Sequence, residues 1–202
     1  MMGEEKSAQE VVDIVLRDKI FYFNSGGGVT LSGGEPLYQP EFTKEILYLS
    51  KLHGIHTAIQ TCGFASQTVI DKILPNLDLV IFDIKHLDDV QHNQVTGQSN
   101  KTILENLKHI NAMGIKIVIQ VPLIPGINDS DDNLESVFKL AQKLKNVEGV
   151  SLLSYHALGA SKYLHIGKTY RLIDLQQPGS EYLKQKLDWA THFGVPLIQF
   201  NG

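Results

Sequence analysis

Cysteine is nearly absent from this chain: Cys62 is the only one among 202 residues. A single cysteine cannot form a disulfide within the chain, so nothing in the sequence points to an oxidising compartment. One thiol also cannot supply a cysteine-rich metal site or hold an iron–sulfur cluster by itself. The sequence therefore predicts a protein without a disulfide framework and without a complete cluster site of its own.

Long apolar runs and an excess of basic charge are missing as well. No stretch of about 18 apolar residues occurs, which argues against a membrane span. Residues 1–9 are polar and acidic, unlike a signal peptide, so we expect a cytoplasmic protein with no membrane partner. The formal net charge is −4, without the clustered Lys and Arg of a nucleic-acid surface. We therefore expect no nucleic-acid partner.

The sequence does contain a regular alternation of short β-branched runs and longer segments of helical period. Residues 79–82 are continuously apolar, as in a strand buried on both faces of a parallel sheet. Such alternation predicts one α/β domain over residues 1–202, with a parallel sheet of right-handed βαβ units. The predicted strands are 29–31, 56–61, 79–82, 115–121, 150–154 and 195–199, and the predicted helices are 8–19, 41–53, 67–74, 101–113, 131–145 and 179–193.

Polar and glycine-rich residues follow these strands directly, at the edge where ligands bind in barrels and doubly wound sheets. The first group is Ser32-Gly33-Gly34-Glu35-Pro36. Two glycines let the backbone approach a ligand closely, although a plain strand-to-helix turn explains them equally well. The group lacks the spacing of a phosphate-binding loop, and a glutamate would repel phosphate. A carboxylate beside exposed carbonyls suits a ligand that carries an ammonium group.

The second group, Asp83-Ile84-Lys85, ends the buried strand, and period-two alternation turns Asp83 and Lys85 to the same side. Three roles are open for this pair. The two charges can satisfy each other, Lys85 can form a Schiff base, or Lys85 can pair with a ligand carboxylate. The local spacing does not decide among them.

Two further side chains are candidates from position alone. His156 follows the strand at 150–154, where a ligand would lie. Cys62 has no adjacent base in the sequence, so we predict a packed thiol there and not a nucleophile. The remaining histidines lack metal-ligand spacing, and we predict no metal site formed by this chain's residues.

Four short sequence motifs lie in order at the predicted strand ends. They are VTLSGGEPLYQPE at 29–41, DIKH at 83–86, VPLIPGIND at 121–129, and LLSYH at 152–156 with Gly159 and Lys162. Together they resemble the glycyl-radical-enzyme activating enzymes, radical S-adenosylmethionine proteins whose type member is the pyruvate formate-lyase activase. The resemblance runs over essentially the whole chain. It implies an incomplete parallel (β/α) barrel of the six-stranded radical-enzyme type, without its first strand.

The resemblance also implies roles for individual residues. Gly33, Gly34 and Glu35 match the motif whose backbone groups hold the amino group of S-adenosylmethionine. In the motif Asp83-Ile84-Lys85, the aspartate and the lysine match a pair that contacts the methionyl and ribose parts of this cofactor. His156 matches a histidine near the nucleoside portion.

One implied feature is weakened by a substitution. Thr61 falls where the family has a loop lining a monovalent-cation site, and the family often has an acidic residue beside it. This chain has Gln60 there, which puts a cation site in doubt.

A larger departure concerns the iron–sulfur cluster. The family holds a [4Fe–4S] cluster through C-x-x-x-C-x-x-C upstream of the glycine-rich motif, whereas this chain has only Cys62, downstream of it. We therefore expect a fragment or a truncated homologue that lacks the first strand, the cluster loop and a ferredoxin-like insert. Residues 21–28 are similar to the subgroup that carries such an insert just before them.

The expected function is the S-adenosylmethionine- and substrate-binding part of an activase, which generates a 5′-deoxyadenosyl radical that takes hydrogen from a glycine of its partner. The partner is a glycyl radical enzyme such as pyruvate formate-lyase or a relative, and the electron donor is flavodoxin or ferredoxin. The chain alone is expected to be inactive, and the cluster to be present only in a full-length protein. Two alternatives stay open: a small-barrel lyase that uses Lys85 as a Schiff base, and a binding homologue without a cluster.

Overall fold

The computed structural model describes residues 4–157, 172 and 175–199. In this part of the chain, five parallel strands form one sheet in the order β1-β2-β3-β4-β5. The strands are β1 (Gly28–Leu31), β2 (His56–Thr61), β3 (Leu79–Asp83), β4 (Lys116–Leu123) and β5 (Val147–Ser154). Because the spatial order follows the chain order, right-handed crossovers place the connecting helices on one side of the sheet, as in a barrel. This confirms the predicted partial parallel barrel.

Helices precede, connect and follow these strands. The α-helices are α1 (Ala8–Leu16), α2 (Lys19–Ser25), α3 (Pro40–Leu52), α4 (Gln67–Ile73), α5 (Asp89–Thr96), α6 (Lys101–Ala112), α7 (Asp131–Lys143) and α9 (Ser180–Ala190). Short 3₁₀ segments are η1 (Pro36–Tyr38), η2 (Leu74–Asn76) and η4 (Thr191–Phe193). Ser66 and Ser130 cap α4 and α7 through their side chains. The caps fix where these helices begin after the polar strand ends.

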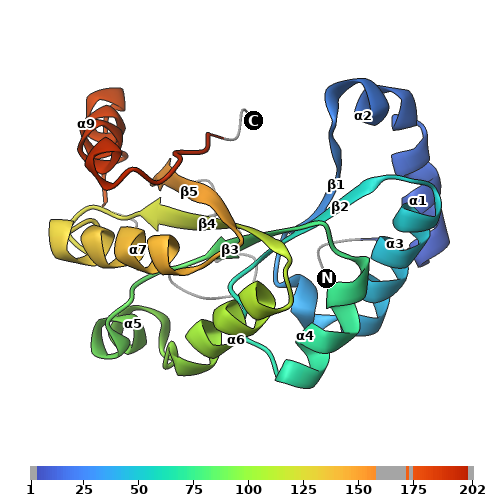
Figure 1. The fold of residues 1–202 in the computed structure, drawn as a ribbon, viewed down its shortest axis with the longest axis horizontal. Helices are drawn as coiled ribbons and strands as arrows, with labels where there is room; N and C mark the ends of the chain where they lie inside the picture. The colour runs from blue at the N-terminus through green and yellow to red at the C-terminus, as the bar shows by residue number, and fades with distance from the viewer. Residues whose placement is uncertain (1–3, 158–171, 173–174, 200–202) are drawn as a thin grey trace.

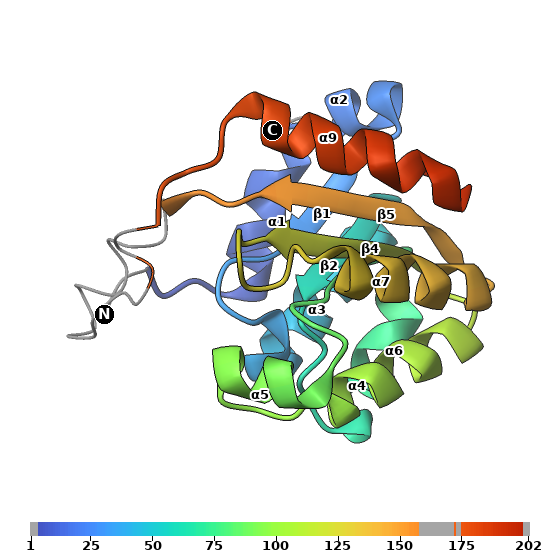
Figure 2. The same cartoon turned by 90° about the vertical axis from the view of Figure 1, so that its left-hand side faces the viewer.

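The main core lies between the sheet and its outer helices. Leu47 of α3, Leu107 of α6 and Val137 of α7 are fully buried against alternate strand residues such as Val80 and Ile119. Figure 1 shows α3, α4, α6 and α7 on one side of the curved sheet, and Figure 2 shows α9 lying along β5. The opposite face, called the inner face below, carries the other set of alternate strand residues.

The predicted helix over 8–19 is present as α1, but it ends at Leu16, where the chain turns before α2. Arg17 and Asp18 donate backbone hydrogen bonds three residues back, to Ile14 and Val15, which tightens and ends α1. Val12 of α1 is buried, whereas no residue of α2 is buried. The short second helix has no apolar face packed on the core, so apolar periodicity in the sequence does not predict it.

The predicted strand over 195–199 is reduced to a short parallel pairing with β5. This segment makes a single parallel bridge between Val150 and Leu197. Pro196 accepts a bond from the Val150 amide at 2.8 Å, but it has no N–H to extend the ladder. The loop at 157–170, with Gly159 and Lys162, lies almost wholly outside the described residues. The single domain over 1–202 therefore stays a prediction.

Candidate functional site

The strand register brings polar side chains into one row on the inner face. Asp83 of β3 lies opposite Gln120 of β4, and Gln120 lies opposite Ser151 of β5. The loops after β1 and β2 reach the same edge, because strands in a parallel sheet all end there. This edge is where the sequence predicted the ligand-binding residues.

Glu35 ties the loop after β1 to the end of β2. Its carboxylate accepts bonds from the Leu37 amide at 3.1 Å and the Thr61 hydroxyl at 2.6 Å. The amide and the thiol of Cys62 donate to its other oxygen, each at 3.1 Å. Four donors of this chain thus occupy the carboxylate, which leaves the backbone of the turn, and not this side chain, as the open group.

The two glycines of the turn are exposed and unobstructed. Gly33 has a φ of 114°, a conformation that a residue with a side chain rarely adopts. No heavy atom lies within 4 Å of the position that a Cβ would take at Gly33 or Gly34. The peptide groups of this turn can therefore be approached closely by a ligand.

Cys62 is a half-buried thiol in contact with a carboxylate. Desolvation and the bond to Glu35 raise the pKa of the Cys62 thiol to about 11, while the charge of Lys85 acts in the opposite direction. Such a thiol is neutral near pH 7 and is a poor nucleophile and metal ligand.

At the next residue, a side chain at Gly63 would overlap the ring of Phe82. The end of β2 thus runs closely over β3.

Asp83 and Lys85 share the inner face, as period-two alternation predicted. The Lys85 ammonium lies 3.4 Å from one carboxylate oxygen of Asp83, and the Gln120 amide donates to the other oxygen at 2.8 Å. Ile84 points the other way and is 2% exposed in the main core. Its side chain anchors the Asp83-Ile84-Lys85 motif to the core and does not reach the inner face.

Asn128 fixes the loop that carries Lys85. It is 1% exposed, and its side-chain amide donates to the carbonyls of Lys85 and Pro122, both at 2.8 Å. Its side-chain oxygen accepts from the Ile124 amide at 2.7 Å. Asn128 thus gives a structural role to part of the motif VPLIPGIND, for which the sequence alone predicted no role. Only the position of Asn128 within that motif could have marked it as a candidate.

The remaining candidates are not joined to this group. His156 is exposed beyond β5 and, among the described residues, makes no hydrogen bond or ion pair with Glu35, Asp83 or Lys85. Thr61 is buried, and its hydroxyl is engaged by Glu35 and by the Gly63 amide. Gln60 is half-buried.

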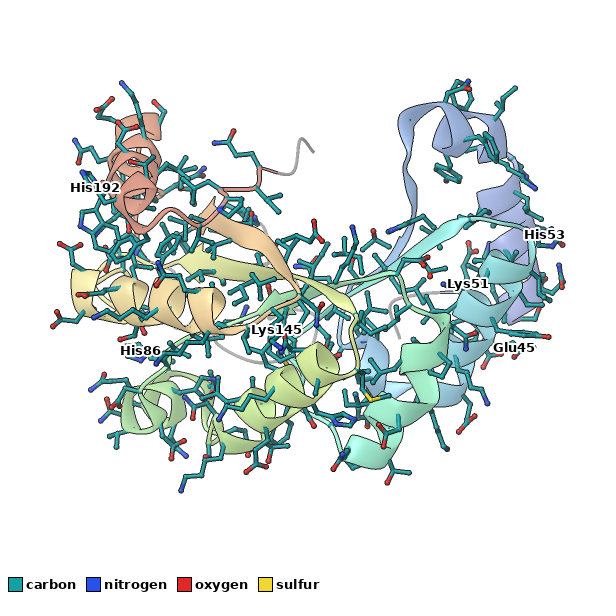
Figure 3. All side chains as sticks on the ribbon, viewed as in Figure 1. Glu45, Lys51, His53, His86, Lys145 and His192 are labelled. Atoms are coloured by element: carbon teal, nitrogen blue, oxygen red, sulfur yellow. The ribbon has the colours of Figure 1, made fainter. Side chains whose placement is uncertain are left out.

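Neither a metal site nor a membrane span occurs in the part of the chain that the structure describes. No three His, Cys, Asp or Glu side chains lie together there in a way that could hold a metal ion. Figure 3 shows His53 and His192 at opposite ends of the molecule. No helix within the described ranges is long and apolar enough to cross a membrane.

Comparison with known proteins shows to which family this chain belongs. Residues 2–150 match the family model described as the Radical SAM superfamily. The chain belongs to the radical SAM superfamily. The trans-4-hydroxy-L-proline dehydratase activating enzyme of Clostridioides difficile is 43% identical over 202 residues, with 98% of this radical SAM chain and 67% of the relative covered. The choline trimethylamine-lyase activating enzyme of Oleidesulfovibrio alaskensis is 42% identical, with 84% of this chain and 56% of the relative covered.

A solved structure agrees with these matches. A domain of the pyruvate-formate lyase-activating enzyme from Bacteroides vulgatus superposes with a TM-score of 0.69 at 28% identity, covering 87% of this chain and 99% of that domain. The relatives of this radical SAM chain are thus activating enzymes, as the resemblance implied. The chain spans 56% and 67% of the length of the two relatives named above.

The two cofactors typical of this superfamily fit this chain unequally. An accessible ammonium at Lys85 and an open glycine backbone offer partners for the carboxylate and amino groups of S-adenosylmethionine. A [4Fe–4S] cluster needs several thiolates, whereas this sequence has one cysteine, whose thiol is neutral and bonded to Glu35. The residues of this chain fit the first cofactor and do not fit the second.

Proposed function

We propose that this radical SAM chain is the S-adenosylmethionine- and partner-binding part of an enzyme that activates a glycyl radical enzyme. When bound, S-adenosylmethionine supplies the 5′-deoxyadenosyl group that takes hydrogen from a glycine of the partner. The chain's own residues bind and orient this cofactor. One observation carries the proposal: an open glycine turn after β1 and an accessible lysine after β3 lie at the same edge of the sheet, with β2 between these two strands.

Each predicted residue has a distinct task in this proposal. Carbonyl groups of Gly33 and Gly34 accept bonds from the cofactor's ammonium group, while Glu35 holds their turn against β2. The Lys85 ammonium pairs with the methionyl carboxylate. Asp83 accepts a bond from a ribose hydroxyl.

Ile84 and His156 complete the proposed set. Ile84 keeps the loop after β3 fixed to the core through its buried side chain. His156, exposed beyond β5, contacts the nucleoside portion.

The partner belongs to the glycyl radical enzymes, as the names of the relatives support. Pyruvate formate-lyase or a relative of it is the proposed partner, with flavodoxin or ferredoxin as the electron donor. The proposed location is the cytoplasm. The [4Fe–4S] cluster would be held by residues of a full-length protein and not by Cys62.

Binding of S-adenosylmethionine to the chain tests this function. Isothermal titration at millimolar concentrations should give a measurable Kd, and Lys85→Ala should weaken it about tenfold or more, because a charge-assisted pair contributes about 1.5–3 kcal/mol. Lys139→Ala is the matched control, since Lys139 forms an exposed pair with Glu135 on α7. Equal binding by the wild type and Lys85→Ala would overturn the assignment.

Reconstitution with iron and sulfide tests the proposed absence of cluster ligands. We expect no stable [4Fe–4S] absorbance or spin signal, because a single neutral thiol cannot hold the cluster. Cys62→Ser should behave as the wild type does. A stable cluster that cleaves S-adenosylmethionine and is lost in Cys62→Ser would contradict the proposal.

The Schiff-base alternative has less support. A nucleophilic lysine is neutral and desolvated, whereas the side chain of Lys85 is 36% exposed and lies beside the Asp83 carboxylate. Borohydride trapping with pyruvate should therefore give no adduct at Lys85. A Lys85 adduct detected by mass spectrometry would favour the lyase.

A further inference from the structure

The Asp83 carboxylate is held mainly from β4. Its contact with Lys85 is 3.4 Å long, beyond the 2.7–2.9 Å of a strong charge-assisted bond. The bond from Gln120 is 2.8 Å, and Gln120 is only 4% exposed. The shorter contact, from the more deeply buried donor residue, fixes the carboxylate better than the longer contact from Lys85 does.

Gln120 holds the same segment a second time through its backbone. Its carbonyl accepts a hydrogen bond from the Ile84 amide at 2.9 Å. The orientation of its side-chain amide is set by chemistry, since only the NH₂ group can donate to a carboxylate. Gln120 therefore forms hydrogen bonds with both the side chain of Asp83 and the peptide group that follows Asp83. Because its amide is neutral, it adds no charge to the site.

We propose that Gln120 is a positioning residue that orients the Asp83 carboxylate on the inner face for the bound ligand. This inference rests on the proposed function, because Asp83 is the group that would contact S-adenosylmethionine. Gln120 acts through Asp83: its amide occupies one carboxylate oxygen and turns the other toward Lys85. Without this amide, the carboxylate is free to rotate out of this orientation.

Two variants of Gln120 separate positioning from packing. Gln120→Leu removes the donor and puts an apolar side chain of comparable size in its place. Gln120→Glu keeps the shape but sets two carboxyl groups against each other, so that they share a proton as pH falls. A protonated Glu at this position donates to Asp83 again, and a packing role gives no such recovery with pH.

The expected results are specific to each variant. Gln120→Leu should raise the Kd for S-adenosylmethionine about tenfold, the effect of losing a hydrogen bond to a charged group. Gln120→Glu should bind weakly at pH 7 and approach wild-type affinity at pH 5. Gln142→Leu is the control, since the Gln142 amide bonds the Phe193 carbonyl far from the edge. It should leave the Kd unchanged.

Other charged or titratable groups near this edge are Lys85, Glu35, Cys62 and His156. The wild-type pH profile is therefore the baseline, and the difference between the variant and wild-type profiles is the result. Carbon-13 NMR of the Asp83 carboxyl, recorded without ligand, gives a second readout. Its titration should shift in Gln120→Leu and not in Gln142→Leu.

The two readouts distinguish the possible failures. If the wild type binds no S-adenosylmethionine, the proposed function fails, and the Asp83 titration still decides whether Gln120 holds the carboxylate. If the ligand binds but both Gln120 variants match the wild type in Kd and in the Asp83 titration, the positioning role is overturned. Where Gln120→Leu does not fold, the pH recovery of Gln120→Glu decides alone.

Discussion

At the scale of single residues, Cys62 shows how a neighbouring carboxylate controls a thiol. Burial and Glu35 raise the pKa of Cys62 to about 11. Alkylation by iodoacetamide should therefore be slow at pH 8 in the native chain and should accelerate toward pH 11. In urea the thiol should regain an ordinary pKa of about 8.5 and react readily at pH 8. Equal rates in the folded and unfolded chains at pH 8 would exclude the contact.

The matched variant for this experiment is Glu35→Gln. It removes the negative charge that opposes ionisation of Cys62, so the pKa of the thiol should fall and native alkylation at pH 9 should become faster. A variant that alkylates as slowly as the wild type would show that burial alone protects the thiol.

Asp78 is a second residue whose contacts can be tested. It pairs with Lys51 at 2.7 Å and accepts from the amide and hydroxyl of Thr57 at 2.9 and 3.0 Å. Asp78→Asn should lower the free energy of unfolding by about 1–3 kcal/mol in urea titrations at pH 7. The exposed Glu41–Lys72 pair is the control, and Glu41→Gln should cost less than about 1 kcal/mol.

The pH dependence of Asp78 follows from its pKa. Burial alone would raise this pKa, but the bonds from Lys51 and Thr57 outweigh it, and the net pKa is lowered. A depressed folded pKa means that the stabilisation is complete above the ordinary value of about 3.9. It is lost as pH falls through the folded pKa. The difference in stability between the wild type and Asp78→Asn should therefore shrink as pH falls below about 3.9, and a difference that stays constant down to pH 2 would refute this.

At the scale of elements, α9 is attached to α7 through aromatic rings. Phe138 of α7 is fully buried, and its ring centroid lies 6.3 Å from that of Trp189 and 5.0 Å from that of Phe193. Phe138→Ala should destabilise the chain by about 3–5 kcal/mol. Because Trp189 is the only tryptophan, its emission should shift to longer wavelength as the ring becomes solvated. Phe138→Leu should cause smaller changes in both, and unchanged emission in Phe138→Ala would contradict this packing.

Prediction from the sequence succeeded for elements that bury a periodic apolar face. The helix over 41–53 and the strand over 79–82 each matched a buried pattern and are present within a residue or so. The helix at 19–25 buries nothing, so apolar periodicity missed it, and the segment at 195–199 makes only one bridge to β5, so apolar periodicity overextended it. The site followed the same rule: Asp83 and Lys85 were expected on one face, whereas the link from Gln120 depends on register between strands, which a single sequence does not show.

At the scale of the whole molecule, the site depends on the assembled sheet. The glycine turn follows β1 and Lys85 follows β3, so β2 must pair with both strands before the two groups face one ligand. Glu35, bonded to the end of β2, and Asn128, bonded from the loop after β4 to Lys85, extend this dependence to the neighbouring strands. A ligand that needs both groups binds the folded sheet and not an isolated loop.

This dependence predicts that S-adenosylmethionine stabilises the entire chain against heat. A ligand at ten times its Kd that binds only the folded state adds about 1.4 kcal/mol. For a domain of this size, that corresponds to a rise in Tm of roughly 3–6 °C. Differential scanning fluorimetry at one fixed ligand concentration should show the shift in the wild type and in Lys139→Ala. In Lys85→Ala it should fall to about a third or less, because a Kd weakened tenfold or more is no longer below the ligand concentration. A Tm shift of equal size in Lys85→Ala would mean that the ligand stabilises the fold from a site other than this edge of the sheet.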